Sequence, residues 1–134
     1  MTPEKLQNLN EEKLFNYLKD NHISDLSLEK IYSYTDCSSK RFNCSIELKC
    51  RYKHYDMLMI EIDKYRHLLE TPQKNKRYIV STPEGIYSID ITSKLPSDIK
   101  WQWCPATTEF ENTNKVYKLV GFYDINGDNC KKLL

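Results

Sequence analysis

The chain has 134 residues, of which 40% are hydrophobic and 29% charged, and its formal net charge is +1 at pH 7. This length suggests one domain with a real core, and the composition is that of an ordinary soluble globular protein. The small net charge excludes a bulk polycation that would bind nucleic acid through charge alone. Cations nevertheless gather in one stretch against the single acid Glu47, and they are Lys40, Arg41, Lys49, Arg51, Lys53 and His54.

The cysteines and the N-terminus bear on the cellular compartment. The cysteine count is five, an odd number, and no C-x-x-C occurs, which argues against a disulfide framework and a zinc site. Reduced thiols in a cytosolic compartment are the simplest interpretation. The first residues lack the apolar segment of a signal peptide, and no apolar run approaches membrane-spanning length. We therefore expect a cytoplasmic, intracellular protein without a membrane partner.

The first half of the chain begins with a helix and a hairpin. Asn10 can cap a helix over residues 11–20, because early acids favour a helix N-terminus and leucines recur there at helical spacing. A strand is predicted over 28–35, a turn over 36–41 and a second strand over 42–51, which completes the hairpin.

The second half alternates a helix with further strands. Apolar residues at helical spacing predict an amphipathic helix of about four turns over 54–70. Strands over 77–82 and 86–91 form a second hairpin, residues 92–115 are expected to be irregular, and a last strand follows over 116–123. This order predicts an α/β fold of the α+β type, with a mixed sheet flanked by helices in a single domain.

The strand over 42–51 separates polar from apolar side chains. Alternation places Ser45, Glu47, Lys49 and Arg51 on one face. The other face is apolar and can pack under the helix that follows; it holds Cys44, Ile46, Leu48 and Cys50.

Asp36 lies eleven residues before Glu47, across the predicted hairpin. Two carboxylates brought together repel, and one must take a proton unless a cation joins them. Mg²⁺ removes that conflict, because it accepts carboxylate oxygens, backbone carbonyls and waters. The carbonyl of Leu48 is a natural further ligand. Lys49 could hold the attacking water or offset charge on the phosphorane oxygens, so these residues form a complete set for phosphodiester hydrolysis.

The motif D-x10-E-x-K, on a strand that leads into an amphipathic helix, resembles the PD-(D/E)XK nuclease superfamily, and small phage and bacterial members in particular. The resemblance covers roughly residues 10–91. It implies a restriction-endonuclease-like core with an αβββαβ-type sheet, followed over 92–134 by an irregular loop and a last strand. It also implies a metal-dependent nuclease that hydrolyses DNA, with Mg²⁺ or alternatively Mn²⁺, and it makes a homodimer an expectation.

Carried over residue by residue, the resemblance makes Asp36, Glu47 and Lys49 catalytic, with Asp36 and Glu47 as the metal acids. Many members also place a glutamate on the first helix, where Glu12 is the better-placed candidate and Glu11 the second.

The resemblance also bears on the following helix and on DNA contacts. Some members carry Gln and Tyr four residues apart after E-x-K, and Glu61 and Tyr65 have that spacing with Glu in place of Gln. The cations expected to contact nucleic acid are Arg41, Arg51, Lys53 and Lys64.

Each of these residues has a simpler interpretation. Glu47 and Lys49 could be a solvated pair on an edge strand, and Asp36 could be only a turn residue. Tyr65 fits core packing. His54 could shuttle a proton, although a surface position is the commoner case.

Two further points stay open at this level. Trp101 and Trp103 could stack on a nucleobase, although core packing is the more common outcome for tryptophan. The second function hypothesis is a catalytically silent protein of the same fold that binds nucleic acid or serves as a phage structural or assembly subunit.

Overall fold

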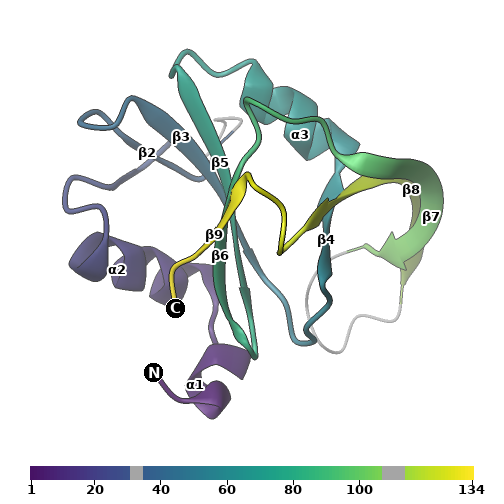
Figure 1. The fold of residues 1–134 in the computed structure, drawn as a ribbon, viewed down its shortest axis with the longest axis horizontal. Helices are drawn as coiled ribbons and strands as arrows, with labels where there is room; N and C mark the ends of the chain where they lie inside the picture. Colours follow the sequence, from purple (N-terminus) through teal and green to yellow (C-terminus); the bar gives the residue numbers. More distant parts are fainter. Residues whose placement is uncertain (31–34, 107–113) are drawn as a thin grey trace.

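The computed structural model of the chain describes residues 1–30, 35–106 and 114–134. Its helices are α1 (Pro3–Gln7), α2 (Glu11–Asn21) and α3 (Ile62–Leu69). Its strands are β1 (Ser27–Leu28), β2 (Cys37–Ser39), β3 (Cys44–Cys50), β4 (Met57–Glu61), β5 (Asn75–Thr82), β6 (Gly85–Asp90), β7 (Ser97–Pro105), β8 (Lys115–Asp124) and β9 (Cys130–Lys132). The fold is therefore mixed α/β, with most of the regular structure in strands (Figure 1).

The strands form two sheets. The larger sheet has the order β1-β2-β3-β5-β6-β9, and all its neighbours are antiparallel except β3 and β5, which are parallel. Parallel neighbours need a crossover connection, which here passes through β4 and α3. The smaller sheet is antiparallel, with the order β4-β8-β7, and it lies beside α3 (Figure 1).

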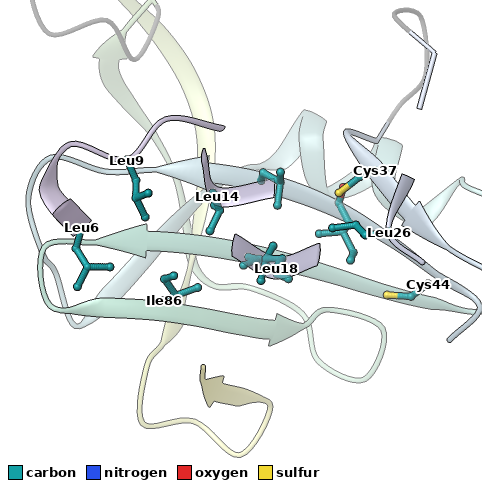
Figure 2. Packing of buried hydrophobic residues seen from close by; sticks show 11 residues of the cluster. Leu6, Leu9, Leu14, Leu18, Leu26, Cys37, Cys44 and Ile86 are labelled. Carbon is teal, nitrogen blue, oxygen red and sulfur yellow. The ribbon is translucent and has the colours of Figure 1, made fainter. Parts of the chain in front are cut away.

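Helix α2 forms where the sequence predicts it. The Asn10 side chain caps it by accepting a hydrogen bond of 2.8 Å from the backbone N–H of Lys13, and two acids occupy its first turn. Leu14 and Leu18, both fully buried, lie over the larger sheet (Figure 2). They cover the apolar face of β3, so this face packs under the preceding helix, whereas the sequence pattern had suggested the following one.

The substitution Leu18→Ala is expected to lower the free energy of unfolding by about 2–5 kcal/mol, because the surrounding core cannot collapse fully into the cavity. Chemical denaturation with urea measures this loss. Asn16→Ala, at an exposed position of the same helix, is the matched control. A loss at Leu18 no larger than that at Asn16 would contradict the packing described.

The opposite face of the larger sheet packs against α3 and the smaller sheet. A second cluster of buried residues fills this layer, and its members include Leu58, Ile60, Tyr65, Leu68, Tyr78, Val80, Tyr87 and Ile89. Tyr65 is therefore a core residue, as its spacing favoured. The face of β3 that carries Glu47 looks toward this layer, and the Ser45 hydroxyl lies 2.5 Å from that of Thr71 just after α3.

Two predicted elements of the first half differ from the structure. Cys37–Ser39 form strand β2 rather than part of a turn, and the hairpin turn falls over 40–43, where Asn43 takes a positive φ of 47°. Asparagine tolerates this conformation better than most residues. β1 is shorter than the strand predicted over 28–35, and residues 31–34 lie outside the described ranges.

The helix predicted over 54–70 is wrong in its first part. Residues Met57–Glu61 form β4, and only Ile62–Leu69 are helical. Leu58 and Ile60 are buried at a period of two, as a strand paired with β8 requires. Apolar Met59 and Ile62 complete the spacing that also fits a helix. The apolar pattern of this segment fits a helix and a strand alike, and pairing with β8 therefore determined that it is a strand.

The predicted limits of the core are also too narrow. Ser97–Pro105 form β7 within the segment expected to be irregular, and Cys130–Lys132 add β9 to the larger sheet. Leu6 and Leu9 at one end of the chain and Leu133 and Leu134 at the other pack on the α2 cluster. None of the helices in the described ranges has both the length and the apolar character needed to cross a membrane.

Candidate active site

Strand β2 covers only the beginning of β3, which leaves an open edge. The pairing ends at Cys37 and Ile46, and no strand in the described ranges continues on that side along Glu47 and the residues after it. Asp36 precedes β2 and fills the first position beyond the pairing. Its N–H donates to the Ile46 carbonyl at 3.1 Å, and its Oδ2 accepts from the Leu48 N–H at 2.7 Å. Asp36 is therefore held against β3 and lies outside the hairpin turn.

Glu47 brings a second carboxyl group to Asp36. Burial, and then the neighbouring Asp36 charge, raise the pKa of Glu47 to about 8. The Lys64 ammonium of α3 lies 3.7 Å from Oε1 of Glu47 and opposes the rise. The Glu47 side chain is only 12% exposed, so the alternative of a solvated edge-strand residue is wrong for Glu47.

Lys49 lies two residues further along the same face of β3. Burial is the largest cause that lowers the pKa of Lys49, and the adjacent Arg51 charge adds to it. The carboxylates of Glu61 and Glu11 act in the opposite direction. Lys49 is thus a half-buried ammonium set among both signs of charge, and Glu11, which interacts with Lys49 and with Asp36, lies between it and the carboxyl pair.

The first helix contributes Glu11 rather than Glu12. Burial, and then the Asp36 charge, raise the pKa of Glu11, while Lys49 and Lys64 lower it. Both glutamates are exposed residues of α2, and the interactions with Asp36, Lys49 and Lys64 are those of Glu11. Adjacent residues of a helix point about 100° apart, so only one of the two can face the open edge of β3. The choice of Glu12 as the better-placed glutamate is therefore not supported by the geometry.

The smaller sheet adds an ion pair at the far side of Lys49. Glu61, at the end of β4, accepts a short hydrogen bond from the Lys118 ammonium of β8. Both side chains are 27% exposed, and both act on the pKa of Lys49. Glu61 was singled out by its spacing to Tyr65. Lys118 lies 57 residues further along the chain, and only the pairing of β4 with β8 brings it near the site.

The cations expected to contact nucleic acid are not grouped together. Lys64 faces Glu47, and exposed Lys53 follows the end of β3. Arg51 is half-buried and donates from Nη2 to the Met59 carbonyl at 3.2 Å, so it braces β4 against β3. Arg41 lies in the turn before β3, at the opposite end of the strand from Lys49, and so stands apart from the other three.

The structure differs from the commoner interpretations of His54 as a surface residue and of the tryptophans as core residues. The His54 side chain is only 10% exposed; its ring nitrogens lie 2.8 Å from the Thr82 hydroxyl and 3.1 Å from Oδ1 of Asp56. His54 therefore lies in the loop after β3 with its ring fixed by Thr82 and Asp56. Trp101 and Trp103 are 57% and 65% exposed, so neither is a core residue.

The donor set can be compared with the needs of a divalent ion. Within residues 1–30, 35–106 and 114–134, no three His, Cys, Asp or Glu side chains are arranged to hold a metal by themselves. Mg²⁺, however, is commonly bound through one or two carboxylates and retains several waters, and Asp36 and Glu47 supply two. The N–H and C=O of a strand residue point to the same side, so the Leu48 carbonyl is directed to the open edge where its N–H meets Asp36. Two acids and this carbonyl fit such an ion.

Comparisons with protein-family models, with curated proteins and with solved structures give no significant match. The functional argument therefore depends on the geometry of the open edge of β3.

Proposed function

We propose that this protein is a metal-dependent nuclease that hydrolyses DNA phosphodiester bonds at the open edge of β3. The observation that carries the proposal is the close pair of carboxyl groups of Asp36 and Glu47, in which the Asp36 charge helps to raise the pKa of Glu47, with Lys49 two residues further along the same face of β3. A scaffold gains nothing from this arrangement, since the repulsion and the burial of Glu47 both cost stability. A bound divalent cation offsets that cost.

The arrangement of the elements supports a restriction-endonuclease-like core. Helix α2 is followed by antiparallel β1, β2 and β3, then by α3 and by β5, which is parallel to β3. This is the αβββαβ order that the resemblance implies, with β4 as an insertion before α3. The acid that precedes β2 and the E-x-K segment on β3 then occupy adjacent strands, as such a site requires.

Each residue of the chain has a definite part in the proposed reaction. Asp36, Glu47 and the Leu48 carbonyl would supply the oxygens for the ion, and Glu11 would offer a further acid near Asp36. Mg²⁺, when bound, supplies a nucleophilic water at neutral pH and stabilises charge on the phosphate. Lys49 would orient that water or donate to the phosphate oxygens.

Lys64 has a second part in this proposal. Its ammonium is the cation nearest to Glu47 among the contacts described, at 3.7 Å. Its side chain is 55% exposed, so it can leave the carboxylate and turn toward a phosphate when an ion takes its place. Lys53 provides a further exposed cation after β3.

The substitution Asp36→Asn is expected to reduce metal-dependent DNA cleavage to the level seen with EDTA. Asparagine can still accept the hydrogen bond from Leu48, so the local fold is retained while one charged ligand is lost. Cleavage of linear, circular and single-stranded DNA in Mg²⁺, Mn²⁺ or EDTA measures the effect. Asp20→Asn, at an exposed position of α2, is the matched control and should cut like the wild type.

The same assay separates the two function hypotheses. A wild-type protein that cuts no DNA and is not stabilised by either metal would overturn the nuclease proposal. In that case the catalytically silent alternative, a nucleic-acid-binding or assembly protein, would have to be tested by its partners. Equal activity of wild type and Asp36→Asn would also overturn the proposed role of the carboxylate pair.

A further inference from the structure

Strands β7 and β8 carry three exposed aromatic rings on one face of the smaller sheet. Trp101 and Tyr117 stack with ring centroids 5.5 Å apart and an interplanar angle of 21°, and Trp103 lies 5.2 Å from the same tyrosine. The exposed fraction is 57% for Trp101, 65% for Trp103 and 55% for Tyr117. Exposing more than half of three large rings leaves roughly 300–400 Å² of contiguous aromatic surface in water. A patch of this size usually marks an interaction site.

The same rings border an open strand edge. β7 is the last strand of the smaller sheet, and no strand in the described part of the chain pairs with its outer side (Figure 1). Its register with β8 is regular from Lys100 to Pro105. A long, exposed edge with apolar side chains is a template for another strand.

The direction of the backbone groups along β7 follows from one hydrogen bond. Just after the strand, the Ala106 N–H donates to the Asn114 carbonyl at 2.9 Å, so position 106 points toward β8. Every second residue of an antiparallel ladder bonds to the same neighbour. Gln102 and Cys104 therefore also point inward, and the N–H and C=O groups of Trp101 and Trp103 point to the free edge. Pro105, which has no N–H, occupies an outward position and leaves no donor unsatisfied there.

We propose that β7 pairs antiparallel with β7 of a second copy of this chain about a two-fold axis at Gln102. This register places Trp101 of each copy opposite Trp103 of the other, and both residues point outward, so they can exchange backbone hydrogen bonds. Their rings fall on one face and join the two aromatic surfaces into a single cluster. Pro105 falls opposite Ile99, another apolar residue, and no like charges oppose each other on the paired strands.

A second copy fits this surface better than nucleic acid does. A two-fold interface must be self-complementary, and the register centred on Gln102 meets that condition for backbone and side chains together. On β7, Lys100 is already paired with Asp98 at 3.2 Å. Exposed Lys115 of β8, opposite Pro105, adds one cation to the aromatic face, which is too few to follow a phosphate chain. A stable dimer buries about 800 Å² per partner, which the rings, the paired backbones and flanking Ile99 can approach together.

The two tryptophans of the chain both lie in this interface, so tryptophan fluorescence reports on it directly. The wild-type protein is expected to have a dimer mass by light scattering at high concentration. On dilution, its emission should shift to longer wavelength and become more accessible to iodide as the dimer dissociates. Trp103→Lys is expected to raise the dissociation constant by roughly thirtyfold or more, the effect of removing an interface hot spot.

Two controls make this test independent of folding. Trp101→Lys should weaken the dimer in the same way, and Tyr55→Lys, at an aromatic position 62% exposed elsewhere, should leave the mass unchanged. Thermal unfolding confirms that all variants are folded. A monomer mass at every concentration would overturn the proposal. Tryptophan protection by single-stranded DNA in such a monomer would assign the rings to nucleic acid instead. None of these readouts depends on cleavage, so the proposed nuclease activity can fail separately.

Discussion

Replacing Lys49 with methionine is expected to lower the rate of DNA cleavage by about 10²–10³-fold, the usual cost of removing one charged group that stabilises a transition state. Methionine keeps much of the length of the lysine stem and tolerates a half-buried position, so the strand should remain intact. The carboxylate pair of Asp36 and Glu47 is unchanged. The stabilisation of the fold by Mg²⁺ should therefore persist in the variant, which separates loss of chemistry from loss of metal.

Single-turnover cleavage at saturating Mg²⁺ measures the chemical step, and thermal unfolding with and without Mg²⁺ measures binding. Lys13→Met, at an exposed position of α2, is the matched control and should cut at the wild-type rate. If Lys49→Met cuts as fast as the wild type, Lys49 is a structural cation and takes no part in the reaction. If it loses the response to Mg²⁺ as well, its role is to support the acids.

The stability of the metal-free protein is expected to fall as the pH rises from about 5 through 8, by an amount on the order of a few kcal/mol. Glu47 ionises near its ordinary value of 4.5 in the unfolded chain and at about 8 in the folded one. Between these values the folded state holds a proton that the unfolded state has released. Stability is therefore highest below the lower value and is lost as Glu47 ionises beside Asp36, with Glu11 adding repulsion and Lys64 opposing it.

The substitution Glu47→Gln should flatten this pH dependence, because glutamine keeps a hydrogen-bonding group next to Asp36 and cannot ionise. Unfolding followed across the pH range in wild type, Glu47→Gln and the exposed-site control Glu70→Gln makes the comparison. Mg²⁺ should stabilise the wild type more above the pKa of Glu47 than well below it, since ligation requires the ionised form. Parallel curves for wild type and Glu47→Gln would contradict the raised pKa.

The carboxylate pair connects these two predictions. Its repulsion makes the site costly without a cation, and in the proposed function a divalent ion offsets that cost. Without metal, Glu47→Gln should therefore be more stable than the wild type at neutral pH, and with metal it should be less active. This opposition between stability and activity is common where charges are held together for catalysis.

Local patterns in the sequence were sufficient for several elements of the fold. Asn10 and the acids after it define the start of α2, because a helix cap is formed by residues three positions apart. Alternation along β3 correctly separates Glu47 and Lys49 from the apolar residues that face α2. The contact of Asp36 with β3 follows from the same local pattern, since a hairpin brings residues of known separation together.

Only the tertiary structure decided the rest. The segment Met57–Glu61 has apolar residues that satisfy a helix and a strand alike, and its pairing with β8 made it a strand. Lys118 joins the surroundings of Lys49 from a distant part of the chain, and no local signal indicates its position or its pairing with Glu61. The choice of Glu11 over Glu12 depends on how α2 is rotated on the sheet, which Leu14 and Leu18 fix by packing.

The exposure of Trp101 and Trp103 belongs to this second group. Their alternation with Gln102 predicts a strand face and not whether another layer covers it. The larger sheet has a helix on one face and a second layer on the other, while the outer end of the small sheet has none over these rings in the described ranges. The sequence by itself thus determined which residues share a face. The long-range pairing of strands determined which faces are buried, because burial depends on contacts between segments that no local pattern encodes.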